Sequence, residues 1–125
     1  AEVAYETILT SFSKGDRESL KDLLTEKMQA NFSSAIEDRN SKKIKSELTF
    51  IGIKSSAIQK FEKTAEALFF TVKFVSEIIS VKKDKDNKIV EGDPSKIKTV
   101  IDHWKFTRKI SSLNPNWYLA EIKNP

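Results

Sequence analysis

The fold of this chain is decided by VEGDP at Val90–Pro94, IDHWKFTRKI at Ile101–Ile110 and NPNWYLAEI at Asn114–Ile122. The first stretch predicts a strand end and a tight turn, because Gly92 can adopt a positive φ and Pro94 cannot donate to a strand ladder. The other two stretches predict long aromatic strands, and an Asn-Pro-Asn corner precedes the last one. Together they predict the closing strands of a sheet.

The middle of the chain predicts two earlier strands. Residues Leu48–Phe61 are rich in β-forming side chains, and their alternation slips near Gly52, which indicates a bulge and a bend. The segment Leu68–Phe74 alternates cleanly between apolar and other residues. Beyond Val75 the apolar residues change phase, which favours a second strong bend. A charged hairpin tip is expected at Lys82–Lys88.

The first 40 residues predict helices. Apolar side chains recur at helical spacing over residues 1–13, and Gly15 is suited to end that helix. Asp16 and Thr25 are expected to cap two further helices. Helices followed by strands predict an α+β fold, in which a bent antiparallel sheet of about four strands curls around the helices as a cone. We expect residues 1–125 to form a single domain.

The amino-acid composition excludes several kinds of metal and disulfide site. The chain has no cysteine and one histidine, so it offers no disulfide, no thiolate ligand and no multi-histidine metal site. Glu91 and Asp93 flank a glycine and could bind a cation, but the spacing of a calcium loop is missing and a capped turn is favoured. We expect no metal and no cofactor. Residues 1–40 carry a net charge of −3 and residues 41–125 a net charge of +7.

Asp102 and His103 are the one neighbouring acid–histidine pair and the one candidate for acid–base catalysis. A dyad needs both side chains in one pocket, whereas neighbouring residues of a strand point to opposite faces. The pattern places Asp102 with Trp104, and His103 with Lys105. We therefore predict no catalytic residue and no enzymatic activity. An inward Asp102 bonded to a second titratable group beside a cavity would instead favour a dehydratase.

Two sets of side chains are candidates for binding. Aromatic residues of the strands and the third helix are expected in the core and could also line an apolar cavity. They are Phe32, Phe50, Phe70, Phe74, Trp104 and Phe106. Lysines of two loops could contact anionic lipid. They are Lys42, Lys43, Lys45, Lys82, Lys83 and Lys85. Nucleic acid is not an expected partner, because the aromatics lie in apolar strands and the chain has three arginines.

Several motifs resemble the C-terminal domain of the Tim44-like family. FSKGDRESLKDLL at Phe12–Leu24 is similar to the helix–GDR–helix entry of that domain. FTVKFVSE at Phe70–Glu77 is similar to its central strand, and VEGDP to its turn. PNW at Pro115–Trp117 is more similar to bacterial members than to mitochondrial ones. The resemblance spans nearly the whole chain and implies the nuclear-transport-factor-two-like cone.

The resemblance also implies a function. Mitochondrial members use this domain as a peripheral docking module of the inner-membrane import machinery, and amphipathic helices before the domain contact cardiolipin. It therefore implies a non-enzymatic adaptor or scaffold at the bacterial inner membrane, or alternatively on the matrix side of the mitochondrial one. Its partners would be anionic, cardiolipin-like lipid, with help from an upstream segment, and translocation or membrane-assembly proteins. The alternative is a cone that binds a lipid or small molecule, such as a dehydratase or isomerase.

Overall fold

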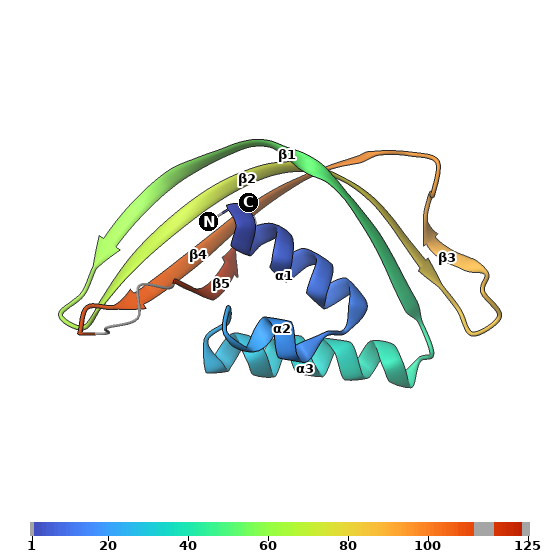
Figure 1. Cartoon of the computed structure of the whole chain (residues 1–125), viewed down its shortest axis with the longest axis horizontal. Coiled ribbons are helices and arrows are strands. Elements are labelled where there is room, and N and C mark those ends of the chain that lie inside the picture. Colours follow the sequence, from blue (N-terminus) through green and yellow to red (C-terminus); the bar gives the residue numbers. More distant parts are fainter. Residues whose placement is uncertain (1, 112–116, 124–125) are drawn as a thin grey trace.

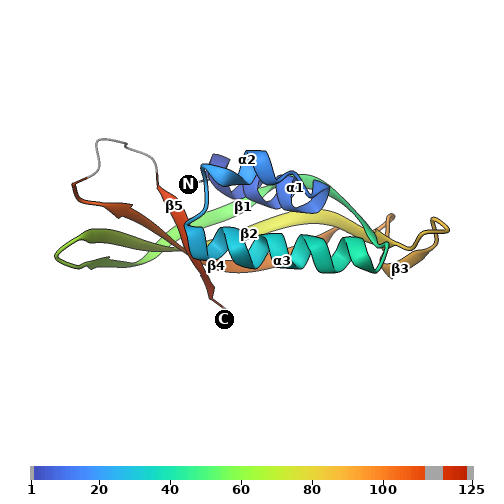
Figure 2. The same ribbon diagram turned by 90° about the horizontal axis from the view of Figure 1, so that it is seen from below.

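A computed structural model describes residues 2–111 and 117–123, and it shows three helices under an arched antiparallel sheet (Figure 1). The helices are α1 (Glu2–Lys14), α2 (Arg17–Lys21) and α3 (Glu26–Ser41). The strands are β1 (Lys45–Lys63), β2 (Ala67–Lys83), β3 (Ile89–Gly92), β4 (Lys98–Lys109) and β5 (Tyr118–Lys123). The strand order is β1-β2-β4-β5, and short β3 pairs with the far end of β2. All three helices lie on one face of the sheet (Figure 2). The predicted α+β class and helix-covered bent sheet are confirmed.

The helix boundaries follow from the capping residues that the sequence indicated. Gly15 has a φ of +73°, the left-handed conformation that ends a helix. Asp16 accepts a hydrogen bond from the Ser19 amide and caps α2, and Thr25 does the same for α3 through the Met28 amide. These caps lie within a few residues of the amides they satisfy, which is why the sequence predicts them.

The bend of the sheet comes from bulges in β1. The pairing of β1 with β2 shifts between Phe50 and Gly52, as predicted, and shifts twice more further along β1. β1 also begins three residues before the predicted Leu48. The predicted phase change at Val75 is wrong. β2 pairs with β4 without a break from Ala67 to Ile78, and Ser76, not Val75, faces the core. Ile78 continues the inner face in phase with Phe74 and Ser76, whereas Ile79 lies in the opposite phase. Because both faces of β2 carry apolar side chains, alternation alone cannot distinguish the inner face from the outer one.

Gly92 confirms the predicted turn. Its φ is +88°, and a Cβ added there would lie 2.0 Å from the backbone oxygen of Ser80. No other residue fits such a close approach without a backbone shift. Asp93 then accepts hydrogen bonds from the amide and hydroxyl of Ser95, at 2.9 and 2.7 Å. The predicted corner at Asn114 and Pro115 lies outside the described residues.

The core is an aromatic cluster centred on Tyr5 of α1. Its ring stacks on Phe74 of β2 at 4.2 Å, and the ring of Trp104 on β4 lies 4.6 Å away. Phe50 of β1 contacts the same ring edge-on at 6.3 Å. One helical residue therefore packs against three neighbouring strands, and burial of these large rings is the main attraction between helix and sheet.

Candidate functional site

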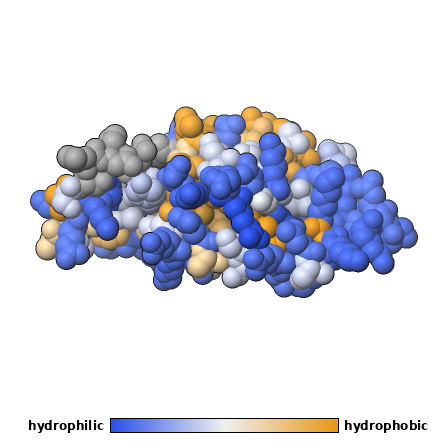
Figure 3. Space-filling view, turned by 60° about the horizontal axis from the view of Figure 1, so that its bottom comes forward, coloured by the Kyte–Doolittle hydropathy of each residue, from blue (hydrophilic) through white to orange (hydrophobic). Residues whose placement is uncertain are grey.

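The two predicted lysine loops meet at one end of the molecule. Lys45 at the start of β1 is the register partner of Lys83 at the end of β2, and Ser46 is the partner of Lys82. We call this region the basic end, defined by Lys42, Lys43, Lys45, Lys82, Lys83 and Lys85. It lies on the right in Figure 1, and hydrophilic residues dominate the same side of the surface in Figure 3.

Half of these lysines have an acidic partner. The pairs are Lys42–Asp38 at 3.1 Å, Lys82–Glu91 at 3.1 Å and Lys83–Glu47 at 3.2 Å. Lys43, Lys45 and Lys85 make no ion pair within residues 2–111 and 117–123. The two charges of an exposed ion pair largely cancel when seen from a distance. The electrostatic potential at the surface of the basic end is therefore set by the three unpaired ammonium groups.

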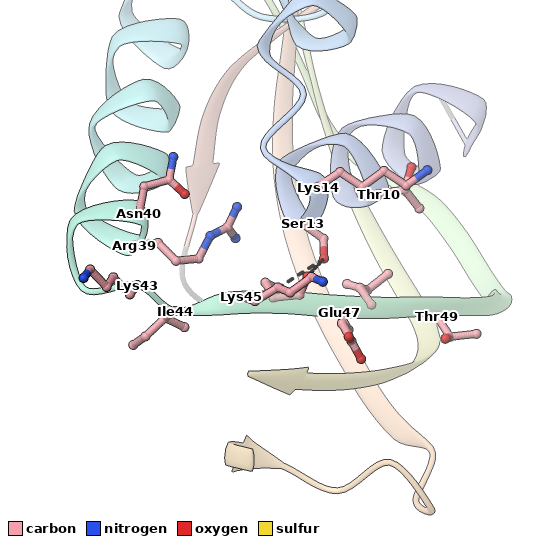
Figure 4. A pocket seen from close by; sticks show the side chains of 12 residues that line it. Thr10, Ser13, Lys14, Arg39, Asn40, Lys43, Ile44, Lys45, Glu47 and Thr49 are labelled. Carbon is pink, nitrogen blue, oxygen red and sulfur yellow. Dashed lines mark hydrogen bonds between the residues drawn. The ribbon is translucent and has the colours of Figure 1, made fainter. Parts of the chain in front are cut away.

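A cavity of about 610 Å³ opens at the basic end, between the last turns of α1 and α3 and the first residues of β1 (Figure 4). We call it the basic pocket. Four cationic side chains line it: Lys14, Arg39, Lys43 and Lys45. Lys14 and Arg39 lie outside the two lysine loops that the sequence indicates. Their only signal was a basic residue in the last turn of a helix, which is ordinarily explained by the helix dipole.

Arg39 holds the walls of the basic pocket together. Its Nη2 donates to the carbonyl of Phe12 at 2.8 Å, and its guanidinium lies 5.2 Å from the Phe12 ring centre. Burial lowers the pKa of Arg39, but a guanidinium keeps its charge in proteins. Ser13 on α1 contacts the hydroxyl of Ser46 on β1 at 3.2 Å. These contacts fix the ends of α1 and α3 and the start of β1 relative to one another.

The six candidate aromatic residues do not share one cavity. Phe70 and Phe106 border an apolar cavity of about 900 Å³ under the opposite end of the sheet. Phe32 and Trp104 border a second one of about 520 Å³ between α1, α3 and β5. Phe74 is completely buried in the core, and Phe50 packs against that core. The cone interior is therefore filled at its centre by the cluster around Tyr5.

Asp102 and His103 are separated by the sheet, as the alternation predicts. Asp102 Oδ2 accepts a 2.5 Å hydrogen bond from the Tyr5 hydroxyl, which also lies 2.9 Å from the Ser76 hydroxyl. His103 pairs in register with Lys73 and Lys123, and its buried Nδ1 has no hydrogen-bond partner among the described residues. The two side chains therefore cannot act as a dyad.

Asp102 nevertheless has the surroundings that would favour a dehydratase, namely a neighbouring cavity and a hydrogen bond to a second titratable group. It borders the 520 Å³ cavity and is bonded to a second titratable group. Burial, reinforced by the carboxylate of Asp102, raises the pKa of Tyr5 far above its ordinary value. A fully buried phenol held neutral in this way is a poor proton-transfer partner near pH 7. Its evident role is to tie α1 to the sheet.

The acidic turn after β3 is occupied by local contacts. Glu91 pairs with Lys82, and hydrogen bonds from Ser95 lower the pKa of the exposed Asp93 carboxyl.

In the part of the chain that the structure describes, no three His, Asp or Glu side chains are placed to hold a metal ion. Within the same residues, no helix combines the length and the apolar character that crossing a membrane requires.

Comparisons with known proteins agree with this architecture. The family model described as the Tim44-like domain matches residues 1–124. A search of the curated proteins found no match. Among solved structures, the intermembrane space region of the chloroplast protein ARC6 is similar, with a TM-score of 0.55 and 11% sequence identity. The match covers 97% of this chain and 88% of that one. At this identity the likeness shows the fold alone.

Proposed function

Because the chain belongs to the Tim44-like domain family, a family of membrane-associated scaffolds, we propose that it is a non-enzymatic adaptor at an inner membrane. Its basic end faces the anionic lipid of the bilayer, of which cardiolipin is the expected kind. Its remaining surface is available to translocation or membrane-assembly proteins. The membrane is the bacterial inner membrane, with the matrix side of the mitochondrial one as the alternative.

The observation that carries this proposal is the convergence of the two lysine loops. Separate in sequence, they would each present a few dispersed charges. The pairing of Lys45 with Lys83 places them on one end of the molecule. Each lysine near an anionic surface contributes about 1 kcal/mol, and the contribution decays within a Debye length of about 8 Å. Charges gathered on one end can act on the same patch of bilayer.

Electrostatic attraction of this kind is weak and sensitive to salt. A peripheral protein that binds tightly adds buried apolar area to its charges. At the basic end the described residues expose two aliphatic side chains, Ile89 and Val90 of β3, but no aromatic one. The exposed Phe61 lies on the hairpin at the other end of the sheet. We therefore propose that this domain binds anionic bilayers weakly by itself, and that an additional segment strengthens the contact.

Vesicle co-sedimentation across salt concentrations tests the proposal. The triple variant Lys43→Gln, Lys45→Gln, Lys85→Gln removes the unpaired charges of the basic end. A matched control replaces Lys54, Lys63 and Lys109, which are exposed and unpaired among the described residues and lie outside the basic end. We expect salt-sensitive binding to cardiolipin-containing vesicles that the first variant abolishes and the control retains. Equal loss in both variants, or tight binding that salt does not weaken, would contradict the proposal.

The alternative, a cone that binds a small molecule or lipid, is favoured by one observation. Asp102 and Trp104 together border the 520 Å³ cavity, and the buried Trp104 Nε1 has no acceptor among the described residues. A dehydratase or isomerase would need Asp102 to exchange a proton with a bound substrate. An Asp102→Asn variant that folds but loses turnover of a small hydroxy-carbonyl substrate would establish the alternative and overturn the adaptor.

A further inference from the structure

We infer that the basic pocket is a binding site for one phosphate group. The inference deepens the proposed function, and it rests on that function for the expectation that a lipid head group is the source. The same chemistry would also accept a free phosphate anion. Three features of the pocket carry the inference: its net charge, its supply of charged donors and its size.

The charge of the pocket is positive after every local compensation. Among the described residues, four cations line it and Glu47 is the one acidic lining residue. Glu47 lies 3.2 Å from Lys83, which is outside the lining, so this acid is already neutralised. The C-terminal ends of α1 and α3 each contribute about half a negative charge. Because Lys43 points away at the rim, two half charges against the other three cations leave a net charge of about +2 in the space.

Most of the charged hydrogen-bond donors in the pocket are not engaged by other groups of the protein. The last-turn carbonyls accept from backbone amides: Phe12 from Gly15, Ser11 from Asp16, Asp38 from Lys42, Asn40 from Lys43 and Arg39 from Ile44. The ammonium groups of Lys14 and Lys45 are therefore not needed to satisfy the helix ends. Arg39 has five N–H donors and gives one to Phe12, so most of its fork stays available.

The side chains are arranged around one space. Figure 4 shows Arg39, Ser13 and Lys45 facing the gap between the two helix ends and β1, whereas Lys43 points away at the rim. A guanidinium and an ammonium group that face each other across a gap with no free carboxylate repel, and an anion between them removes that repulsion. Charge-assisted hydrogen bonds to phosphate oxygens are the strong kind, and arginine matches their geometry with two parallel bonds.

The size of the pocket favours an esterified phosphate over a bare ion. A volume of about 610 Å³ lies within the usual range for small-molecule sites, about 300–1,000 Å³. It leaves room for the glycerol of a lipid head group beside the phosphate. The exposed Lys43 and Lys45 at the mouth place this group where a bilayer surface would meet the basic end.

An NMR titration of the whole chain tests the inference with soluble probes. The probes are inorganic phosphate, glycerol 3-phosphate and dihexanoyl phosphatidic acid below its micelle concentration, each compared with sodium chloride at equal ionic strength. We expect saturable shifts of the Ser13, Arg39 and Lys45 amide signals with the phosphates and not with chloride. Tighter binding of the phosphatidic acid than of both other probes assigns a lipid source, and equal affinities assign a free anion.

Matched variants locate the site. Lys45→Gln should weaken binding of glycerol 3-phosphate about tenfold, because one charge-assisted contact is lost. Lys54→Gln, on the same strand, exposed and unpaired among the described residues, should leave the affinity unchanged. Absence of saturable shifts, or equal weakening by both variants, would overturn the inference. If phosphate binding is absent but vesicle binding persists, the phosphate site is contradicted and the proposed function is not. If phosphate binds but vesicles do not, the proposed function is contradicted and the phosphate site is not.

Discussion

The hydroxyl of Tyr5 on α1 lies 2.5 Å from the carboxylate of Asp102 on β4, although 97 residues separate them in the chain. The same hydroxyl contacts Ser76 of β2, whose side chain is completely buried. One phenol therefore joins the first helix to two central strands, at the centre of the aromatic core.

Removing this hydroxyl should destabilise the protein. In Tyr5→Phe the ring still packs, but the buried Ser76 and the partly buried Asp102 lose their common partner. We expect a loss of about 1–3 kcal/mol in the free energy of unfolding, measured with urea. Adding Ser76→Ala to Tyr5→Phe should recover part of the loss, since it removes a buried unpaired group. A wild-type unfolding curve for Tyr5→Phe would show that the bond contributes nothing.

Tyr5 should also make stability fall at alkaline pH. The folded state holds the pKa of Tyr5 above its ordinary value of 10.0. Above pH 10 the unfolded chain loses this proton while the folded chain keeps it, so unfolding is favoured as pH rises. Unfolding measured between about pH 9 and pH 11 should show a steeper decline for the wild type than for Tyr5→Phe. Parallel declines would mean that Tyr5 ionises equally in both states.

Trp104 should be among the costliest residues to truncate. Its side chain is 2% exposed and contacts the rings of Tyr5, Phe74 and Phe106. Trp104→Ala should lower the free energy of unfolding by about 3–5 kcal/mol, because transfer energy is lost and a cavity remains. Ile101→Ala, on the same strand and 48% exposed, should cost less than about 1 kcal/mol. A small loss for Trp104→Ala would place this side chain outside the core.

The two glycines of the sheet, Gly92 and Gly52, should differ in how well they tolerate substitution by alanine. Gly92→Ala forces a side chain to within 2.0 Å of the Ser80 oxygen at a φ of +88°, and we expect a loss of about 1–3 kcal/mol. Gly52→Ala meets no atom within 4 Å and should change stability by less than about 0.5 kcal/mol. Thermal and urea unfolding of both variants check this contrast. Equal effects would mean that the turn after β3 relaxes freely.

Local chemistry explains why much of the fold was predictable. Helix caps at Asp16 and Thr25, the left-handed Gly15 and the bulge near Gly52 each depend on a few neighbouring residues. The phase error at Val75 arose because both faces of β2 carry apolar side chains, so alternation could not say which one is inside.

The candidate site was predictable only in part. The two lysine loops stand out in the sequence, but their meeting depends on the register that joins Lys45 to Lys83 across three shifts of pairing. Lys14 and Arg39 join them through the packing of two helices, which no local pattern encodes. The bond between Tyr5 and Asp102 is equally non-local, and the helical spacing of apolar residues over 1–13 does not predict it.

The central claim, that the basic end faces an anionic bilayer, is tested most directly by hydrogen–deuterium exchange on cardiolipin-containing vesicles. Bound protein should show slower exchange at residues 41–46 and 82–89, which contain the lysines of the basic end. Exchange should be unchanged at residues 58–66, at the opposite end of the sheet (Figure 1). High salt should remove the protection, because the contact is electrostatic. Protection confined to residues 58–66, or protection that persists in high salt, would contradict the account.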